Sequence, residues 1–434
     1  MKFIRRTIAI ALVTMLCLIF TACGGGMDVE GPAVDVGSQV GTAQAGEPIP
    51  QAGQAQTDAA TSSDNSSDNA TQETEISPLN TVTVATEGQL RGAVASAGNT
   101  RTNIVLTTDI ELASDFIIPT GAEILMSSEE GHQFSLIASR SMHVVTIEQD
   151  ASLAIANIGI TRTEGTHGYG VWVRRNASFT MHSGIINGNG TTVRDTHAIT
   201  GVRVSSGGAF MMNGGEIMAN NRSGVSVEGG KFVLNNGLIT SNTYRSGVLI
   251  TSTDGSRGSF IMNGGEISHN VDGGGVSISR ADFVMRDGRI AENSSDGSGG
   301  GISVGGHSSF TMYGGEISGN TARQRGGGIM AGGETIINDG LIYNNSAGLE
   351  GGGISVWSMG PLVVNGGVIR GNSSERAGGG VALYGGNFTI TGGWIFDNHA
   401  ETDNDFTIFM GRGNFNNNIF DENNGAIGSG PPAP

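Results

Sequence analysis

The stretch GISVGGHSSFTMYGGEISGN, residues 301–320, contains one full unit of a repeat that decides the fold. Its last part has the form Gly-x-Ile-x-x-Asn, which occurs nine times. The final asparagine moves from Asn189 to Asn398 in eight steps, or about 26 residues a step. Two short segments of alternating apolar residues precede it, at 302–304 and 310–312. A fixed period of this size is typical of repeat architectures.

The repeat predicts a solenoid because one unit cannot bury its own apolar residues, whereas stacked units place them in continuous interior rows. Gly-Gly pairs supply tight corners. An asparagine at a fixed corner can hydrogen-bond to its equivalents one coil away, about 4.8 Å along the stack. The sequence therefore predicts an all-β, right-handed parallel β-helix of about 12 coils with three short strands a coil. The predicted asparagine ladder consists of Asn189, Asn220, Asn242, Asn270, Asn293, Asn320, Asn345, Asn372 and Asn398.

The boundaries of the solenoid, 79–410, follow from where this pattern is strict. Regular repeats occupy 170–398, and degenerate coils occupy 101–169. Residues 79–100 are expected to form an N-terminal cap with a helix, because Thr86 and Gln89 have capping-box spacing. Residues 399–434 are expected to form a C-terminal cap and a loose tail.

The Gly-Gly-Gly-[Ile/Val] starts of four coils resemble repeats of bacterial Gly-rich surface proteins, and the coil pattern resembles the pectin lyase-like superfamily of right-handed parallel β-helices. These starts lie at 299–302, 326–329, 351–354 and 378–381. The resemblance covers roughly residues 100 to 410 and implies the fold. It does not select an activity, because this architecture carries lyases, glycosidases, adhesins and stalks alike.

The N-terminus has the pattern of an export signal, residues 1–22. Three basic residues precede an apolar run from Ile8 to Phe20, and Thr21-Ala22 lead into Cys23. This junction resembles the bacterial lipobox, with Phe20 where leucine is usual. It predicts a diacylglyceryl group on Cys23 and attachment to a lipid bilayer. Cleavage after Ala22 by an ordinary signal peptidase, giving a soluble secreted protein, is the alternative.

Residues 23–78 are predicted to be a disordered acidic and polar tether, since they are rich in Ser, Asp, Asn, Thr, Gly and Gln and poor in apolar residues. No second apolar stretch has the length of a transmembrane helix. The net charge of −17 argues against nucleic acid as a partner. The expected location is the cell envelope, lipid-anchored, with the folded part surface-exposed or secreted.

Two groups of aromatic and basic residues are candidates for glycan binding. If Val and Ile of the first strand of each coil point inward, their neighbours point outward onto one sheet. The residues concerned are Trp172, Arg174 and Arg203 in one group and Trp357 and Tyr384 in the other. Exposed aromatic rings over a flat sheet suit sugar rings. Scattered surface residues without a ligand are the alternative.

A catalytic site has weaker support in the sequence. The outward positions, which include Ser226, Ser355 and Ala382, contain no pair of acidic residues of the kind that glycosidases use. The longest insertion in the repeat, 190–200, is where an active site would lie. Its candidate residues are Arg194, Asp195 and His197, with Glu164 and His167 beside them.

Metal and cofactor sites are not predicted. The eight histidines share no metal-ligand spacing. Asp-Gly pairs at several corners are ordinary turn chemistry, with calcium as the alternative that they leave open.

The outward positions of the second strand form a mostly apolar stripe, which either docks a partner or is covered by the tail or a loop. We name it the apolar stripe, and its members are Met211, Val233, Ile261, Val284, Thr311, Ile336 and Val363.

These features favour a surface-exposed, lipid-anchored and non-enzymatic β-helix that acts in adhesion or as an interaction scaffold. An extracellular glycan or a surface protein is the expected partner. The alternative is a protein that binds or degrades polysaccharide, as a lyase or glycosidase.

Overall fold

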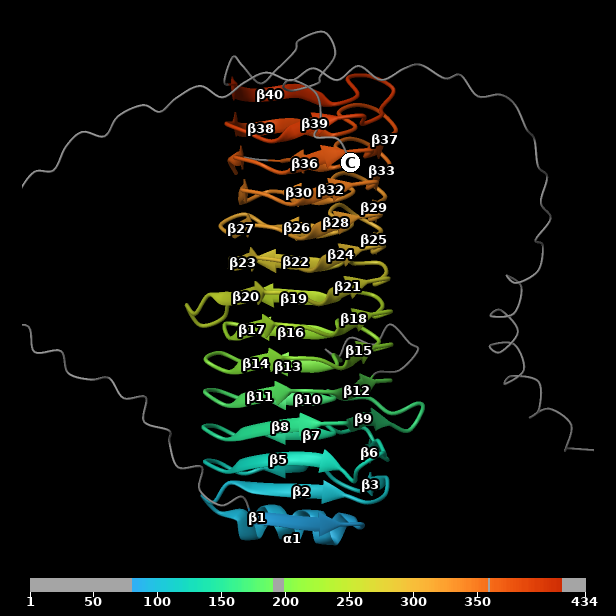
Figure 1. The fold of residues 1–434 in the computed structure, drawn as a ribbon, viewed down its shortest axis with the longest axis vertical. Helices are drawn as coiled ribbons and strands as arrows, with labels where there is room; N and C mark the ends of the chain where they lie inside the picture. The colour runs from blue at the N-terminus through green and yellow to red at the C-terminus, as the bar shows by residue number, and fades with distance from the viewer. Residues whose placement is uncertain (1–79, 190–198, 358–359, 416–434) are drawn as a thin grey trace, which may run out of the picture. The chain divides into compact units, whose positions relative to one another are not determined.

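The computed structural model describes residues 80–189, 199–357 and 360–415, and it confirms an all-β parallel solenoid of about twelve turns. Every pairing between named strands is parallel. Figure 1 shows the strands stacked at successive levels from α1 at one end to β40 at the other. The predicted signal peptide, Cys23, the tether, residues 190–198 with Arg194, Asp195 and His197, and the tail from residue 416 lie outside the described residues.

Three columns of strands form the walls of the solenoid, and buried side chains alternate with more exposed ones along most of these strands. The first column consists of β4 (Phe116–Ile118), β7 (Val145–Ile147), β10 (Val171–Val173), β13 (Val202–Val204), β16 (Val225–Glu228), β19 (Val248–Thr251), β22 (Val276–Ser279), β26 (Ile302–Val304), β30 (Ile329–Ala331) and β34 (Ile354–Val356). The second column consists of β1 (Asn80–Val84), β2 (Thr102–Leu106), β5 (Glu123–Ser128), β8 (Ser152–Ala156), β11 (Ser178–Met181), β14 (Ala209–Met212), β17 (Lys231–Leu234), β20 (Gly258–Met262), β23 (Ala281–Met285), β27 (Ser309–Met312), β31 (Glu334–Ile337) and β35 (Leu362–Val364). Two longer strands, β38 (Val381–Ile390) and β40 (Phe406–Phe415), continue both columns.

The third column is a separate sheet of 12 strands. It consists of β3 (Ile110–Leu112), β6 (Phe134–Ala138), β9 (Ile158–Arg162), β12 (Gly184–Asn187), β15 (Glu216–Met218), β18 (Leu238–Thr240), β21 (Glu266–Ser268), β24 (Arg289–Ala291), β28 (Glu316–Ser318), β32 (Leu341–Tyr343), β36 (Val368–Arg370) and β39 (Trp394–Phe396).

Four of the later coils contain a fourth short strand that the sequence pattern of three strands a coil does not anticipate. These strands are β25 (Ser294–Ser295), β29 (Thr321–Ala322), β33 (Ser346–Ala347) and β37 (Ser373–Ser374). Each of them precedes one of the four Gly-Gly-Gly starts. A Cβ on Gly300 would lie 2.5 Å from the carbonyl oxygen of Gly327 and 2.6 Å from the carbonyl carbon of Thr321. The middle glycine is therefore required because the next coil passes too close for a side chain.

Helix α1 (Glu87–Ala97) packs against the first strands, at the end of the stack in Figure 1. Its N-cap is Thr86, whose Oγ1 accepts a hydrogen bond from the Gln89 backbone N–H at 3.2 Å. The Gln89 side chain in turn accepts from the Ala85 N–H at 2.8 Å. The first contact satisfies a donor that the first helical turn leaves without a partner, and the second satisfies the N–H of the residue before the N-cap. The buried face consists of Leu90, Ala93, Val94 and Ala97.

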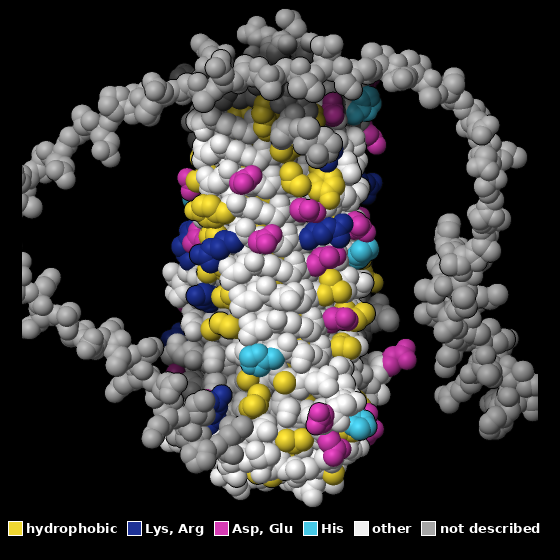
Figure 2. All heavy atoms as spheres, in the orientation of Figure 1, with side chains coloured by type: hydrophobic (Ala, Val, Ile, Leu, Met, Phe, Trp, Pro, Cys, Tyr) yellow, Lys and Arg dark blue, Asp and Glu magenta, His cyan; other side chains and the backbone are white. Residues whose placement is uncertain are grey.

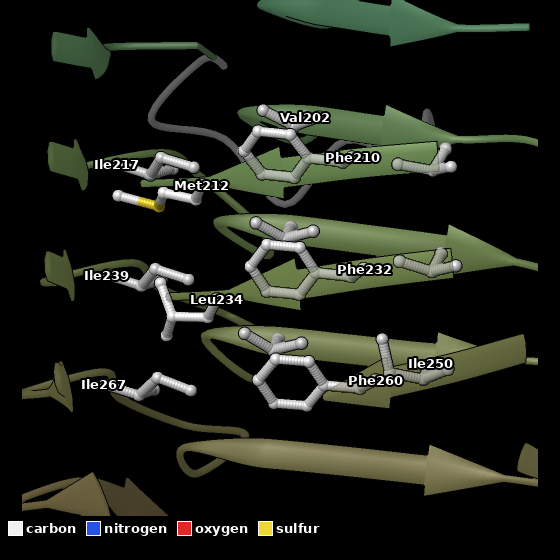
Figure 3. Packing of buried hydrophobic residues seen from close by; sticks show 14 of the residues in the cluster. Val202, Phe210, Met212, Ile217, Phe232, Leu234, Ile239, Ile250, Phe260 and Ile267 are labelled. Carbon is white, nitrogen blue, oxygen red and sulfur yellow. The ribbon is translucent and has the colours of Figure 1, made fainter. Parts of the chain in front are cut away.

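The core consists of rows of identical or similar side chains, one from each coil. Figure 3 shows Phe210, Phe232 and Phe260 at successive levels beside the isoleucine row. From Phe179 to Phe310, neighbouring phenylalanine rings stack with centroids 4.5 to 5.0 Å apart. Stacked rings at this distance add to the free energy gained by burial.

The nine repeat asparagines are all buried and hydrogen-bonded from coil to coil. The Asn320 Oδ1 accepts from the backbone N and from the Nδ2 of Asn293, both at 3.0 Å. The same pair of bonds joins every step from Asn189 to Asn398. In every step the earlier asparagine donates and the later one accepts. The ladder therefore has an acceptor end, the Oδ1 of Asn189, and a donor end, the backbone N–H and Nδ2 of Asn398.

Candidate functional site

Two clusters of aromatic and charged side chains lie on the first-column sheet. We name them the N-terminal patch and the C-terminal patch. The N-terminal patch consists of His143, Glu148, Tyr169, Trp172, Arg174, Arg203, Ser205 and Glu228. The C-terminal patch consists of Arg325, Glu350, Trp357, Arg376 and Tyr384.

Trp172 is at the centre of the N-terminal patch because it is the middle, outward residue of β10. Its neighbours in register are Thr146 of β7 and Arg203 of β13. The indole Nε1–H donates to Ser205 Oγ at 2.9 Å. The Arg174 guanidinium lies 4.1 Å from the centre of the indole ring, a distance that favours a cation–π contact. One face of Trp172 is therefore already occupied by a side chain of its own patch.

Arg203 joins the other members of the N-terminal patch. Its Nη2 donates to Glu228 Oε2 at 2.6 Å, and its Nη1 donates to the Tyr169 hydroxyl. Its guanidinium lies 5.1 Å from the centre of the Tyr169 ring. Burial disfavours the charge of Arg203, but the hydrogen bond with Glu228 and then the interactions with Tyr169 outweigh burial and raise the pKa of Arg203. The side chain is thus fixed and charged.

His143 stacks on Tyr169, with the ring centroids 4.6 Å apart and the planes 10° from parallel. The Tyr169 backbone N–H donates to His143 Nδ1 at 3.1 Å, so the neutral ring carries its proton on Nε2. Burial lowers the pKa of His143. The charge of Asp115 opposes this shift, and three nearby arginines add to it.

The C-terminal patch is assembled around a buried carboxylate. The side chain of Glu350 is 3% exposed, and its Oε2 accepts from Arg325 Nε at 2.8 Å. The Nη1 of Arg376 lies 3.8 Å from the other carboxylate oxygen. Burial, followed by the hydrogen bond and charge of Glu350, raises the pKa of Tyr384. Glu350 thereby fixes both a cation and a phenol next to Trp357.

Trp357 and Tyr384 are neighbours because Val356 of β34 pairs with Leu383 of β38, and each aromatic residue follows its partner by one position. Their ring centroids are 5.2 Å apart. The Arg325 guanidinium lies 4.6 Å from the Trp357 ring centre and 5.0 Å from that of Tyr384. Trp357 is 43% exposed. This patch therefore presents an open aromatic surface that is supported by an arginine.

The two patches have the same four residue types in the same relationship: an arginine lies against both a tryptophan and a tyrosine and pairs with a glutamate. Seven strand pairings separate β10 from β34. At about 4.8 Å per strand, the patches are about 34 Å apart along the axis. The outward residues between them include the small residues Ser277, Ser303 and Gly305 together with Leu249 and Met330.

The structure brings together the candidate glycan-binding residues within each group. It adds eight residues that the sequence did not assign to the patches, namely His143, Glu148, Tyr169, Ser205, Glu228, Arg376, Arg325 and Glu350. The sequence does contain a signal for Arg325 and Glu350. Arg325 lies four residues before Ile329, the first residue of β30, and Glu350 lies four residues before Ile354, the first residue of β34. Equivalent positions in successive coils are neighbours in a solenoid.

Ser226, Ser355 and Ala382 occupy the predicted outward positions of the sheet, but they are covered and not exposed to solvent. Ser355 and Ala382 are 0% exposed and Ser226 is 6% exposed. Gly351 lies close to Ser355, and Gly378 lies close to Ala382. A Cβ added to Gly351 would be 2.7 Å from the Cβ of Ser355, and one added to Gly378 would be 2.9 Å from the Cβ of Ala382. The glycine-rich turn covers part of the sheet.

Two of the candidate catalytic residues, Glu164 and His167, lie in the described part of the chain. Glu164 is exposed in a turn. His167 Nδ1 lies 3.0 Å from Ser141 Oγ. Among the described residues, no group of three or more His, Cys, Asp or Glu side chains is arranged to hold a metal ion. No helix of that same part has the length and apolar content needed to span a membrane.

The apolar stripe is partly exposed along the second column. Met211 is 41% exposed, and the other members are half-buried. Figure 2 shows hydrophobic atoms at successive levels near the left edge, where Figure 1 draws β14, β17, β20 and β23. Elsewhere on the face in Figure 2, charged side chains lie singly or in small groups.

Comparison with protein-family models, with curated proteins and with solved structures gives no significant match.

Proposed function

We propose that this protein is a lipid-anchored interaction scaffold of the cell envelope, non-enzymatic, that holds an extended binding face rigidly. One observation carries the proposal: the hydrogen-bonded ladder from Asn189 to Asn398 runs without a break along the corner beside a sheet that bears two matching patches. Since each coil is bonded to the next, the patches keep a fixed separation. A fixed separation is useful for binding an extended partner and is not required of an inert stalk.

The sequence supports the location. The signal pattern, Cys23 and the polar tether together are typical of an exported lipoprotein whose folded part stands away from the bilayer. The proposal includes a right-handed coil, because parallel β-crossovers are right-handed in about 98% of cases. It also includes kinship with pectin lyase-like β-helices and bacterial surface repeats, on the strength of the resemblance in the sequence.

Fractionation and attachment assays in the producing cell test this proposal. The wild-type chain is expected in the membrane fraction, and Cys23→Ser is expected to be released as a soluble protein. Protease added to intact cells should remove the wild-type solenoid. Cells that lack the protein should attach less well to surfaces or to other cells, and the wild-type gene should restore attachment. Unchanged attachment in cells that lack the protein contradicts the scaffold function.

A polysaccharide-degrading enzyme is the second candidate, favoured by one observation. His143, Tyr169 and Arg203 combine an imidazole, a phenol and a guanidinium in contact at one place. Such groups are able to move protons and stabilise negative charge. Assays for new reducing ends and for new unsaturated products on polysaccharides distinguish this candidate. Product formation that is lost in Tyr169→Phe would favour the enzyme over the scaffold.

A further inference from the structure

We propose that the two patches are the ends of one binding face for an uncharged polysaccharide chain that runs parallel to the solenoid axis. This inference rests on the proposed scaffold function and names its ligand class.

The C-terminal patch has the properties of a preformed stacking surface. Trp357 is 43% exposed, although it is a large apolar side chain. Its ring is supported by Arg325, which the buried carboxylate of Glu350 holds at 2.8 Å. A side chain fixed in this way loses little conformational entropy when a ligand binds. An exposed, rigid indole next to a phenol presents a flat apolar surface that fits the C–H face of a sugar ring.

The ion pairs indicate that the ligand is uncharged. The two arginines that lie against the aromatic rings are each paired with a glutamate, Arg203 with Glu228 and Arg325 with Glu350. Arg376 lies 3.8 Å from the same Glu350 carboxylate and is the exposed arginine of the C-terminal patch. The whole chain carries a net charge of −17, which repels polyanions. The Arg203–Glu228 pair, whose side chains are 26% and 32% exposed, offers both donors and acceptors, whereas the buried Glu350 carboxylate leaves Arg325 to offer donors. The hydroxyl groups of a sugar can bind to both kinds of group, because a hydroxyl both donates and accepts hydrogen bonds.

The spacing indicates a chain rather than a single sugar. Both patches project from the same column of strands, about 34 Å apart along the axis. The outward residues between them include the small residues Ser277, Ser303 and Gly305 and two larger apolar ones, Leu249 and Met330. A polymer that spans this distance contacts both patches at once and gains affinity through the high effective concentration of the second contact.

Affinity gel electrophoresis of the full chain tests the inference. The probes are three neutral polysaccharides, namely hydroxyethylcellulose, soluble starch and arabinoxylan, with polygalacturonate and poly-L-proline as charged and peptide comparisons. At least one neutral polysaccharide is expected to retard the wild-type protein. Trp357→Ala should weaken that retardation at least tenfold. Tyr313→Ala is the matched control, because Tyr313 is 56% exposed outside both patches and should retain full binding.

Dependence on ligand length in the wild-type protein is the first test of the N-terminal patch, and a substitution at Trp172 is the second. Fragments too short to span about 34 Å, or seven strand steps, should bind the wild type at least tenfold more weakly than the polymer. In Trp357→Ala, this advantage of the polymer should disappear. Trp172→Leu, checked for an unchanged circular dichroism spectrum, should have the same effect.

Three results would overturn the inference: binding only to polygalacturonate or poly-L-proline, no retardation by any neutral probe, or equal retardation of Trp357→Ala and Tyr313→Ala. If any one of these results is obtained while cells that lack the protein still attach poorly, the scaffold function stands and the ligand class is wrong. If attachment is also unchanged, both fail.

Discussion

The Asp405 carboxylate completes the hydrogen-bonded ladder at Asn398. Its Oδ1 accepts two bonds from that residue, from the backbone N and from Nδ2, both at 2.9 Å. At the other end, Arg162 Nε donates to Asn189 Oδ1 at 3.2 Å. An anion thus occupies the donor end and a cation the acceptor end, the arrangement that the aligned amide dipoles favour.

We predict that Asp405→Ala destabilises the protein by about 2–4 kcal/mol, because two buried N–H groups of Asn398 lose their acceptor. Asp405→Asn keeps an acceptor oxygen and should change the free energy of unfolding by less than about 1 kcal/mol. Chemical denaturation at pH 7 measures both. Equal destabilisation by the two substitutions would show that the carboxylate charge, not the acceptor, is what matters.

The pH dependence of the same pair of proteins provides a second measurement. Burial raises the pKa of Asp405, and the hydrogen bonds from Asn398 only partly oppose this shift. A carboxyl whose pKa is raised in the folded state contributes stability that is complete below its unfolded pKa and is lost as the pH rises through the folded pKa. Wild-type stability relative to Asp405→Asn should therefore fall as the pH rises above about 4.

A central rung of the ladder should be more sensitive than its ends. We predict that Asn320→Leu costs about 3–5 kcal/mol, since the Asn293 donors, the Asn345 carboxamide oxygen and the Ile290 carbonyl all lose a partner. Asn338→Leu is the control, because Asn338 is partly exposed and accepts one side-chain bond, from Asn365. An unchanged melting temperature for Asn320→Leu would refute a structural role for the ladder.

The sequence predicted the solenoid well because its strongest constraints are periodic. Inward Ile and Val, corner asparagines and positive-φ glycines recur in the regular coils, and an inward Phe recurs in most of them. The candidate sites were less predictable. Arg325 pairs with Glu350 because their two turns are adjacent in successive coils. The residue pattern within a single strand does not predict which turn residues become neighbours. The burial of Ser355 was missed because a strand period of two says nothing about a turn that folds back over the sheet.

His143 should make stability depend on pH in the opposite direction to Asp405. Burial lowers the pKa of His143, with the charge of Asp115 opposing the shift and Arg162 adding to it. The unfolded chain therefore binds a proton more readily than the folded chain below the ordinary histidine pKa of about 6.5. Wild-type stability should fall as the pH is lowered from about 6.5 towards 5. His143→Gln, which retains an acceptor for the Tyr169 N–H, should show a smaller fall in urea denaturation. Parallel pH profiles for the two proteins would rule out this role.

The last prediction concerns the triple glycines that follow the fourth short strands. A Cβ on Gly327 would lie 2.4 Å from the carbonyl oxygen of Ser346 and 2.6 Å from that of Gly352, and both are backbone atoms of the next coil. Gly327→Ala is therefore expected to destabilise the solenoid by about 3 kcal/mol or more, because the coils must separate. A Cβ on Gly306 meets nothing within 4 Å. Gly306→Ala should be neutral or stabilising by about 0.4–1 kcal/mol, since alanine reduces the entropy of the unfolded chain. Thermal unfolding of the two variants decides the question, and an equal melting temperature would mean that the coils tolerate a methyl group where the structure leaves no space for one.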